Sequence, residues 1–388
     1  MHEDFRPSVN IYSEAPLSFF GGGERIAAKI GNYLVSKGYK VTYYEPNNSK
    51  NVKRISEEEV SKMINFDIDQ ITFKKAPFFF GQSLPDPSAF DIRAISLVLL
   101  RRFPSKSYMR KIASVGSKVV FCLHGTAMEP KIHLNPIVLA HQLVMRNGLS
   151  KFASEVKKNH LIYVQFFSET IQSILQRKGV QDDQIFKIKN GVETSHYQPK
   201  RNDDCFTVLF AGRIENLSKG IKRLKKTIKM TYKIDKNIQF AVIGTGKDKH
   251  LLNNLPPNSS YLGFVTEIER LNAFHNSNLL IVTSNLEPYG IVVVEGLFSG
   301  LPVVTSPADG PKNIVEHNGI FGKVSSFRPR TLAETISEYY HLWDEDKKAY
   351  FDLKTTISIE AKRSFDEELM TESYHSMIAD LWEKGNGV

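Results

Sequence analysis

The chain has 388 residues, of which 41% are apolar, so it is long enough for two or three ordinary domains that each bury a core. Its formal net charge is +9, and all of this excess lies in residues 1–195 because the remainder is balanced. No uncharged apolar run approaches the roughly 20 residues of a membrane-spanning helix, so the composition indicates a globular protein and excludes one that crosses a bilayer.

The cysteines and the N-terminus predict a cytoplasmic location. Cys122 and Cys205 lie inside apolar runs, which favours reduced core thiols over a disulfide scaffold. The first residues, MHEDFRPSVNIYSE, include acidic side chains and lack the basic start and apolar stretch of a signal peptide. We therefore expect a cytoplasmic protein, with any membrane contact at the cytoplasmic face.

The first half of the chain predicts one doubly wound sheet. Residues 8–14 form an apolar run that is followed by the helical pattern ERIAAKIGNYLVSKGY. Further apolar runs come after it, namely KVTYYE, KVVFCLH, LIYVQFFS and IFKIKNGV. Short strands that alternate with helices favour a parallel sheet.

A second set of strands predicts another such sheet after a break. The break is the polar stretch at residues 190–204, which contains a proline and lacks periodicity. The apolar runs beyond it are CFTVLFAGR, IQFAVIGTG, SSYLGFV, NLLIVTS and LPVVTS. The sequence thus predicts an α/β protein with two Rossmann-like domains.

The local composition of residues 285–300 favours a strand, because the stretch GIVVVEGLFSG is rich in β-branched residues. The runs on either side are predicted parallel strands, and parallel neighbours need a crossover that is usually a helix. β-branched residues disfavour a helix by only fractions of a kcal/mol each. We therefore predict a helix here. Its N-terminus should lie at the carboxyl edge of the sheet and form an anion site, at Tyr289, Gly290 and Ile291.

The segment from Arg93 to Lys131 is strongly basic. It holds eight basic residues and one acidic residue, Glu129, beside the apolar run LVLLRRF. Such a segment can dock on anionic lipid headgroups or nucleic acid, or it can form a solvated basic face. No RNA or DNA motif is visible, so we expect no nucleic-acid partner, while the lipid surface and the solvated face both stay open.

Several motifs resemble those of the retaining family 4 glycosyltransferases. EPYGIVVVE, residues 287–295, is similar to the family's Glu-x7-Glu signature. Further matches stand in the family's order over most of the chain: GGGERIA, HGT, NGVETSHYQP, FAGRIENLSKG, VIGTG, YLGFV and SGLPVV. An ordered set of this kind is more specific than any one of its members.

The resemblance implies the GT-B fold, in which two Rossmann-like domains face a cleft. It implies an acceptor-binding domain at residues 1–192, a nucleotide-sugar-binding domain at 193–364 and a helix at 365–388 that crosses back to the first domain. The residues alone also predict this helix, because they form an apolar stripe that meets Gly385 at its end: Met370, Tyr374, Met377, Ile378, Leu381 and Trp382.

Donor-binding roles follow from the same resemblance. Arg213 and Lys219 would hold the donor diphosphate together with the amides of Gly290 and Ile291, next to Tyr289. Glu287 would hold hydroxyl groups of the transferred sugar, and Glu295 would hold those of the ribose. A surface ion pair is the alternative for Arg213 and Lys219, and a carboxylate that is favoured by the helix dipole is the alternative for Glu295.

Three further positions complete the implied site. Gly22 and Gly23, after Gly21, would let the backbone approach a phosphate or sugar closely, unless they form only a flexible turn. Val265 would contact the base through its backbone. His124 would project from a strand end into the cleft as a catalytic residue, with a core or capping histidine as the alternative.

The implied activity is retaining transfer of a hexose from a UDP- or GDP-linked sugar to a hydroxyl acceptor, which would be a glycan or a lipid-linked glycan. The leaving phosphate would take the acceptor's proton, so no general base is assigned. Arg213, Lys219 and the helix end would supply the positive charge, so neither a metal nor another cofactor is expected.

Other chemistries stay open from the sequence. The run Asp67-Ile68-Asp69 is the Asp-x-Asp pattern of metal-dependent GT-A transferases, although its context does not match that fold. A glycoside phosphorylase or a sugar-nucleotide epimerase could share the two-domain architecture. A non-catalytic subunit that binds sugar nucleotides is a further alternative, which the presence of both glutamates, Arg213 and Lys219 disfavours.

Overall fold

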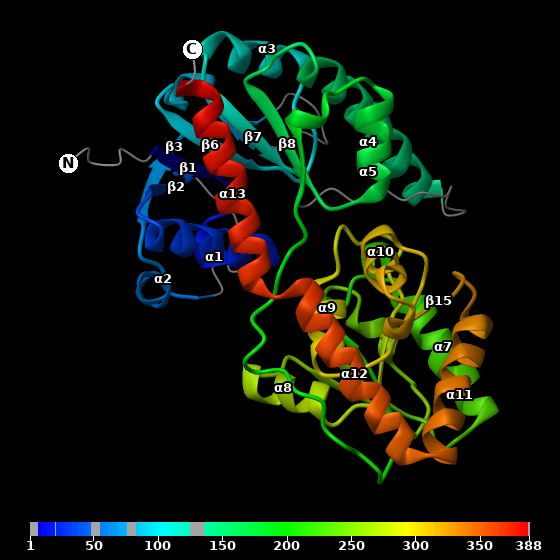
Figure 1. Cartoon of the computed structure of the whole chain (residues 1–388). Coiled ribbons are helices and arrows are strands. Elements are labelled where there is room, and N and C mark those ends of the chain that lie inside the picture. Colours follow the sequence, from blue (N-terminus) through cyan, green and yellow to red (C-terminus); the bar gives the residue numbers. More distant parts are fainter. Residues whose placement is uncertain (1–6, 20, 48–54, 76–82, 125–135, 387–388) are drawn as a thin grey trace. The chain divides into compact units, whose positions relative to one another are not determined.

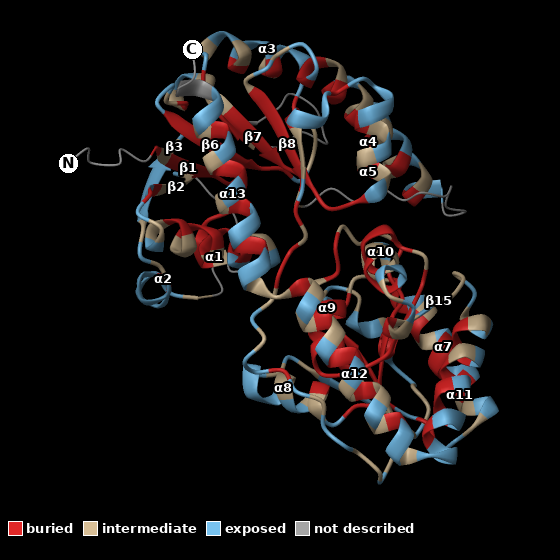
Figure 2. Cartoon of the chain, viewed as in Figure 1, coloured by how far each residue is buried: buried red, intermediate tan, exposed pale blue. Residues whose placement is uncertain are grey.

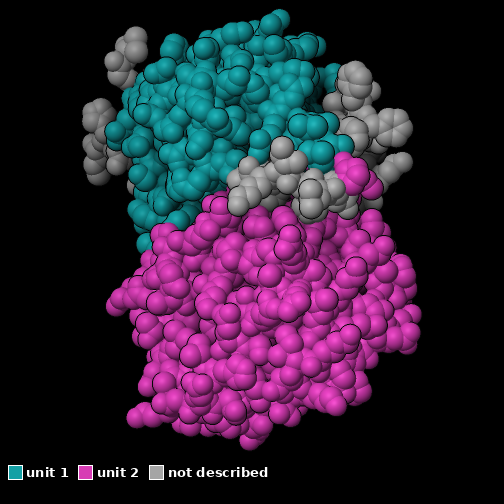
Figure 3. All heavy atoms as spheres, turned by 90° about the vertical axis from the view of Figure 1, so that its right-hand side faces the viewer, with its two compact units in different colours: residues 1–128, 139–191, 368–388 teal, residues 129–138, 192–367 magenta. Residues whose placement is uncertain are grey.

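The computed structural model describes residues 7–19, 21–47, 55–75, 83–124 and 136–386. The chain divides into two compact units, which Figure 3 shows in different colours. Unit 1 comprises residues 1–128, 139–191 and 368–388, and unit 2 comprises residues 129–138 and 192–367. Each unit has its own parallel sheet (Figure 1).

Unit 1 is built on a seven-stranded sheet in the order β3-β2-β1-β6-β7-β8-β9. Its strands are β1 (Ser8–Tyr12), β2 (Lys40–Pro46), β3 (Asp67–Ile71), β6 (Ala94–Leu99), β7 (Lys118–Cys122), β8 (Ile162–Phe166) and β9 (Ile185–Lys187). The helices between them are α1 (Gly22–Ser36), α2 (Glu57–Met63), α3 (Lys106–Val115), α4 (Pro136–Val156) and α5 (Glu169–Arg177). An antiparallel pair, β4 (Phe73–Lys75) and β5 (Ser83–Pro85), precedes β6.

Unit 2 is built on a six-stranded parallel sheet in the order β12-β11-β10-β13-β14-β15. Its strands are β10 (Thr207–Ala211), β11 (Gln239–Ile243), β12 (Ser259–Gly263), β13 (Leu279–Val282), β14 (Val303–Thr305) and β15 (Gly322–Val324). Its helices are α6 (Asn216–Lys219), α7 (Ile221–Ile234), α8 (Glu267–His275), α9 (Ile291–Phe298), α10 (Asp309–His317), α11 (Pro329–Glu345) and α12 (Lys347–Phe365).

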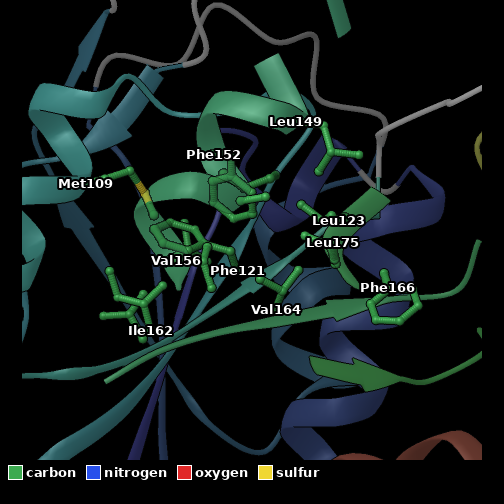
Figure 4. Close-up of a cluster of buried hydrophobic side chains, with 14 of the residues drawn as sticks. Met109, Phe121, Leu123, Leu149, Phe152, Val156, Ile162, Val164, Phe166 and Leu175 are labelled. Carbon is green, nitrogen blue, oxygen red and sulfur yellow. The ribbon is translucent and has the colours of Figure 1, made fainter. Parts of the chain in front are cut away.

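Both sheets are buried on two faces at their centres, as continuous apolar strands require. Every residue of β6 and β13 is buried, and Figure 2 shows the central strands as buried stretches, whereas the edge strands β3 and β12 are largely exposed or partly buried. In unit 1, side chains from the central strands interlock with those of α4 and α5 (Figure 4). Phe121 of β7 meets Phe152 of α4 edge to face, with ring centroids 5.5 Å apart, an arrangement that aromatic pairs prefer.

Each sheet has one point at which the order of its strands reverses. In unit 1 the chain passes from β1 to β2 on one side and from β6 to β7 on the other, while β1 and β6 are neighbours. In unit 2 the neighbours β10 and β13 stand in the same relation to β11 and β14. Open α/β sheets bind ligands beyond the carboxyl ends of such a strand pair.

The helix predicted between the strands of the GIVVVEGLFSG region is confirmed as α9. Its N-cap, Gly290, has φ +96°, a left-handed conformation that a side chain would strain. Val293, Val294 and Glu295 are buried in it. The tertiary requirement for a crossover therefore outweighs the weak local preference of β-branched residues for strands.

The C-terminal helix, α13 (Glu367–Asn386), packs on unit 1. Its apolar stripe is buried at Met370, Tyr374, Met377, Ile378 and Leu381, whereas Trp382 is only partly buried. The Lys118 side chain of β7 donates a hydrogen bond to the Leu381 carbonyl. The helix continues through Gly385, so that glycine does not end it as the sequence analysis expected.

None of the helices in the described part of the chain combines the length and the apolar character that crossing a membrane requires.

Gly220 lies between α6 and α7, and replacing it tests whether the close approach of this turn to Thr283 requires glycine. It has φ +68°, and a Cβ atom there would lie 2.1 Å from the Thr283 carbonyl oxygen. An alanine in a left-handed conformation costs about 1 to 2 kcal/mol by itself. We expect Gly220→Ala to lower the free energy of unfolding by more than this, because the added Cβ atom also clashes with Thr283. Gly263→Ala is the matched control in unit 2, because its φ is +71° and nothing lies within 4 Å of the added atom. Urea unfolding measures both variants, and an equal loss of unfolding free energy in Gly220→Ala and Gly263→Ala would contradict this account.

Candidate functional site

The candidate site of unit 2 lies at the carboxyl ends of β10 and β13. Lys219 ends the short helix α6, which follows β10, and Glu287 lies in the loop between β13 and α9. The Lys219 ammonium and the Glu287 carboxylate form an ion pair, and their side chains are only 15% and 13% exposed. Ser284 donates to the same Glu287 oxygen at 3.5 Å. The structure thus brings two predicted site residues into direct contact.

Backbone hydrogen bonds hold these two segments together. The amides of Asn285 and Leu286 donate to the Ser218 carbonyl at 2.7 and 3.1 Å. The Thr283 hydroxyl donates to the carbonyl of Lys219 at 2.8 Å, and the Asn285 side chain donates to two further carbonyls of α6. The positions of Lys219 and Glu287 are therefore coupled through the main chain as well as through their charges.

Arg223 of α7 supports this junction from inside the unit. Its guanidinium donates to the Thr283 carbonyl at 2.6 Å, to the Asn285 side-chain oxygen at 2.7 Å and to the Phe327 carbonyl at 2.9 Å. Burial lowers the pKa of Arg223 to about 10, so it remains a cation at neutral pH. The sequence analysis missed this residue, because one arginine in the basic, amphipathic stretch IKRLKK carries no distinguishing pattern.

Arg213 lies beside the pair but is more open to solvent. Its side chain is 67% exposed, and its guanidinium is 3.8 Å from Glu215. Lys247, in the loop after β11, contacts the other oxygen of Glu215 at 3.0 Å. Lys247 was also missed, although its place just beyond VIGTG at a strand's carboxyl end was an available signal. There are thus three cations here, on Arg213, Lys219 and Lys247, against the two carboxylates that they contact.

The start of α9 is held against α10. The Gly310 amide donates to the Glu287 carbonyl at 3.1 Å. A Cβ atom at Gly310 would lie 2.3 Å from the carbonyl oxygen of Tyr289, so only glycine permits this approach. Tyr289 is buried, Ile291 is partly buried, and Gly290 joins them as the N-cap. The amides of this first helical turn point away from the helix body, as in known anion sites.

Glu295 lies in a separate, closed cluster. Its carboxylate accepts a hydrogen bond from the Tyr197 hydroxyl at 3.1 Å and is paired with Arg270 of α8. Arg270 also donates to the Tyr197 hydroxyl at 2.8 Å. The Glu295 side chain is only 4% exposed. The sequence analysis assigned neither of these two partners, although Tyr197 lies in the NGVETSHYQP motif.

The remaining predicted donor contact in unit 2 is Val265. It follows β12 and is partly buried, and its neighbour Phe264 is 80% exposed. The described structure gives no polar partner that would define a base-binding role for this turn.

His124 follows β7 in unit 1 and faces the C-terminal helix. Its Nε2 atom shares a hydrogen bond with the Tyr374 hydroxyl at 2.9 Å, and the two rings are nearly parallel. Burial lowers the pKa of His124 to about 4, while burial raises that of Tyr374. Both side chains are therefore neutral near pH 7. This contact agrees with the alternative of a core histidine that packs against another element.

Gly22 and Gly23 begin α1, with Gly21 as the N-cap. The carboxylate of Glu24 folds back on this helix start, since a Cβ atom at Gly21 would lie 2.7 Å from its Oε2 atom. Glu24 is buried and pairs with Arg101 at 3.1 Å. The helix end that the sequence analysis assigned to a phosphate or sugar therefore already has a carboxylate beside it.

Much of the basic segment from Arg93 to Lys131 makes contacts within unit 1. Arg101 pairs with Glu24, and Arg110 is 3.4 Å from the buried Glu155. Lys118 binds α13, as described above. Lys106 and Lys111 of α3 are exposed, whereas Lys131 lies outside the described residues. The patch is thus smaller than the sequence count suggested.

A cavity of about 450 Å³ lies beside α3. It is lined by the β5 region and by α3, with apolar contacts from Leu84, Pro85, Phe103 and Tyr108. Lys74, Asp86, Lys111 and several serines also line it, so the cavity is both apolar and polar in character.

Comparison with known proteins identifies the domain in unit 2. Residues 192–352 match the family model of glycosyl transferases group 1. Unit 2 contains a group 1 glycosyltransferase domain. The resemblance to glycosyltransferases that the sequence analysis drew is confirmed at the level of this domain.

The chain is also similar in sequence to two other proteins. The chain is 29% identical over 149 residues to an uncharacterized glycosyltransferase of Methanocaldococcus jannaschii, covering 36% of this chain and 37% of that protein. It is 28% identical over 194 residues to the alpha-monoglucosyldiacylglycerol synthase of Acholeplasma laidlawii, covering 48% of this chain and 46% of that protein. The chain thus spans under half the length of these two glycosyltransferases.

Among solved structures, HepE of Anabaena in complex with UDP and glucose aligns with a TM-score of 0.66. The alignment covers 96% of this chain and 100% of HepE at 16% identity, and it establishes the fold alone. The chain therefore has the GT-B architecture of two parallel-sheet domains. The GT-A alternative is wrong, and its Asp67 and Asp69 lie exposed on the edge strand β3.

The burial of the His124 ring predicts that the stability of the protein depends on pH. Because its folded pKa of about 4 lies below the ordinary 6.5, folding favours the neutral ring. The stability that this residue contributes should be fully present above pH 6.5 and should be lost as the pH falls toward about 4. NMR titration of the imidazole should give a midpoint near 4, and His124→Gln should flatten the dependence of unfolding on pH in that window. A midpoint near 6.5 would contradict the burial described above.

Proposed function

We propose that the chain is a retaining, metal-independent glycosyltransferase that moves a hexose from a nucleotide-diphosphate sugar to a hydroxyl acceptor. The observation that carries the proposal is the Lys219–Glu287 pair, held at the β10/β13 edge of a group 1 glycosyltransferase domain. The donor would be linked to UDP or GDP, and UDP and UDP-glucose serve as the probes below because HepE was solved with UDP and glucose.

The charges at this edge suit a donor whose leaving group is a diphosphate. Arg213 and Lys219 would bind the diphosphate with the first amides of α9, at Gly290 and Ile291 beside Tyr289. Cleavage of the bond between the sugar C1 atom and the phosphate oxygen puts negative charge on that oxygen, and fixed cations stabilise such charge most where water is excluded. The protein's own cations would thus take the part that a metal takes in other transferases.

Donor binding would also free Glu287. In the unliganded chain its carboxylate is held by Lys219. A diphosphate competes for that ammonium, so Glu287 becomes available to accept hydrogen bonds from hydroxyl groups of the sugar. The acceptor oxygen then bonds to C1 on the face that the phosphate leaves, and the acceptor's proton passes to the departing phosphate oxygen. The configuration at C1 is retained.

The other predicted contacts fit this scheme to different degrees. Glu295 would meet the ribose only if the hydroxyls reach a carboxylate that Arg270 and Tyr197 already hold. Val265 would pack near the base. Gly22, Gly23 and His124 belong to unit 1, and we assign them to the acceptor side of the reaction rather than to the diphosphate.

Variants of the site residues test whether Arg213 and Lys219 bind the diphosphate while Glu287 acts in transfer of the sugar. Arg213→Ala and Lys219→Ala should weaken UDP binding by about 1.5 to 3 kcal/mol each, the value of a hydrogen bond to a charged group. This is roughly 10- to 150-fold in the dissociation constant. Glu287→Gln removes the carboxylate charge that competes for Lys219, so it should not weaken UDP binding, and it should slow single-turnover transfer from UDP-glucose. Calorimetry with UDP and rapid-quench kinetics measure the two effects.

The control is Lys222→Ala, which removes an exposed lysine three residues after Lys219. It should change neither measurement. EDTA should also change neither, because the positive charge belongs to the protein. Loss of transfer on chelation, or equal effects of the variants at Lys219 and Glu287 in both assays, would refute the proposed roles.

The acceptor side is proposed to contact anionic lipid at the cytoplasmic face of a membrane. A relative from Acholeplasma laidlawii is a synthase of a glucosyl diacylglycerol, and the exposed Lys106 and Lys111 lie on α3, with Lys111 lining the cavity. Arg101 and Arg110 are less suited to this contact than the sequence indicated, because ion pairs engage them.

Replacement of Lys106 and Lys111 by Ser should weaken binding to vesicles of anionic phospholipid, by roughly 1 kcal/mol per lysine. UDP affinity should not change. The matched control replaces two exposed lysines of the same unit, Lys151 of α4 and Lys157 in the turn just after it, and removes the same charge. Co-sedimentation with vesicles distinguishes the two pairs, and equal binding by both would show that any attraction depends only on net charge.

A further inference from the structure

Glu215 lies between two cations at the unit 2 edge, and its contacts with them are unequal. Its Oε1 atom is 3.0 Å from the Lys247 ammonium, whereas its Oε2 atom is 3.8 Å from the Arg213 guanidinium. The Ser218 hydroxyl donates to Oε2 at 3.1 Å. Glu215 therefore holds Lys247 closely and Arg213 only loosely, although Arg213 is the nearer of the two in the sequence.

Backbone contacts fix the place of Lys247. The Asp248 amide donates to the Ile214 carbonyl at 3.1 Å. A Cβ atom at Gly246 would lie 2.2 Å from that same oxygen, so this approach requires glycine. The loop after β11 is thus held against the loop after β10 on both sides of Lys247. Its backbone is set next to Glu215 independently of the charges that the two side chains carry.

The Glu215 carboxylate is a fixed negative charge at this edge. Its side chain is 25% exposed, whereas those of Arg213 and Lys247 are 67% and 69% exposed. Although desolvation opposes the effect, hydrogen bonds from Lys247 and Ser218 lower the pKa of Glu215 below its ordinary value. Glu215 is therefore ionised at neutral pH, beside a cation that the proposed donor needs.

A negative charge in this position works against binding of a diphosphate. The carboxylate repels an anion that approaches Arg213, and it competes with that anion for the same guanidinium. Both effects grow where bound ligand displaces water, because the local dielectric constant then falls. Another group must therefore neutralise Glu215 once Arg213 turns to the diphosphate.

Lys247 has the geometry that this neutralisation requires. It contacts Oε1 of the carboxylate, whereas Arg213 contacts Oε2, so departure of Arg213 leaves the contact with Lys247 intact. Ser218 remains on Oε2. The hydrogen bond and the charge of Glu215 raise the pKa of Lys247, so its ammonium stays charged at neutral pH.

We propose that Lys247 is a positioning residue of the donor site, which neutralises the Glu215 carboxylate and so leaves Arg213 available to the donor diphosphate. Arg213 and Lys219 then meet the anion, whereas Lys247 acts through Glu215 alone. The inference rests on the proposed function, because Lys247 has this role only where a diphosphate binds at the edge.

The test uses the full chain and compares UDP with uridine, which lacks the phosphates. Lys247→Gln should weaken UDP binding by roughly 3- to 10-fold at low salt, because one uncompensated charge then faces the anion. Uridine binding should not change. The loss of UDP affinity should shrink in salt of about 1 M, where charges are screened beyond roughly 3 Å. Calorimetry measures UDP binding, and NMR measures uridine binding.

The double variant Lys247→Gln with Glu215→Gln distinguishes an indirect role from a direct one. Glu215→Gln alone should not weaken UDP binding, and in the double variant it should restore the affinity that Lys247→Gln loses. Lys249→Gln is the matched control, because it removes another exposed lysine two residues further along the chain. It should leave UDP binding nearly unchanged.

A loss of UDP affinity that persists in the double variant would show that Lys247 binds the diphosphate itself, and it would overturn the proposed role. Full affinity in Lys247→Gln, an equal loss in Lys249→Gln, or weaker binding of uridine would overturn it as well. If the unaltered protein binds neither UDP nor GDP, the proposed function fails together with the inference, so the two failures are distinguishable.

Discussion

The partly buried guanidinium of Arg223 is the group on which the geometry of the unit 2 site depends. It donates to three oxygens from two loops, with distances between 2.6 and 2.9 Å. A cation that is largely withdrawn from water is costly unless its donors are satisfied, so Thr283, Asn285 and Phe327 must take their places together. Thr283 and Asn285 in turn hold α6, and α6 ends in Lys219. The ion pair at the surface of the edge is thus set from within the core.

The same sheet topology presents different chemistry in the two units. Each sheet reverses its order at one pair of strands, and each reversal gathers charged side chains beyond the strand ends. In unit 2 the Lys219–Glu287 pair lies there, whereas in unit 1 Arg101 contacts Glu24 and Glu14. One sheet topology can thus carry different side-chain chemistry at corresponding edges without any change in backbone design.

The sequence was sufficient for α9, because parallel neighbours force a crossover whatever the local propensity. It predicted most strands of both sheets but missed β3, the central β6 and β15. It also proposed Lys219 and Glu287 as site residues, although not their mutual contact. It did not identify the partners of buried groups. His124 meets Tyr374 across 250 residues of chain, and Glu295 meets Arg270 from a different helix. Such pairs form where the tertiary fold brings faces together, and no spacing rule within one segment encodes them.

The return of α13 to unit 1 has a consequence for how such proteins can exchange parts. The chain leaves unit 1 after Gly191 and re-enters it at Glu368. These two joins lie side by side, because Val192 pairs with Asp366 and its amide donates to the Phe365 carbonyl at 3.1 Å. In topological terms residues 192–367, which hold the whole sheet of unit 2, are an insertion between adjacent points of unit 1, an arrangement that domains tolerate well. Recombination between relatives would therefore preserve both sheets if residues 192–367 moved as one block, whereas a single crossover near residue 192 would pair unit 1 with a foreign final helix.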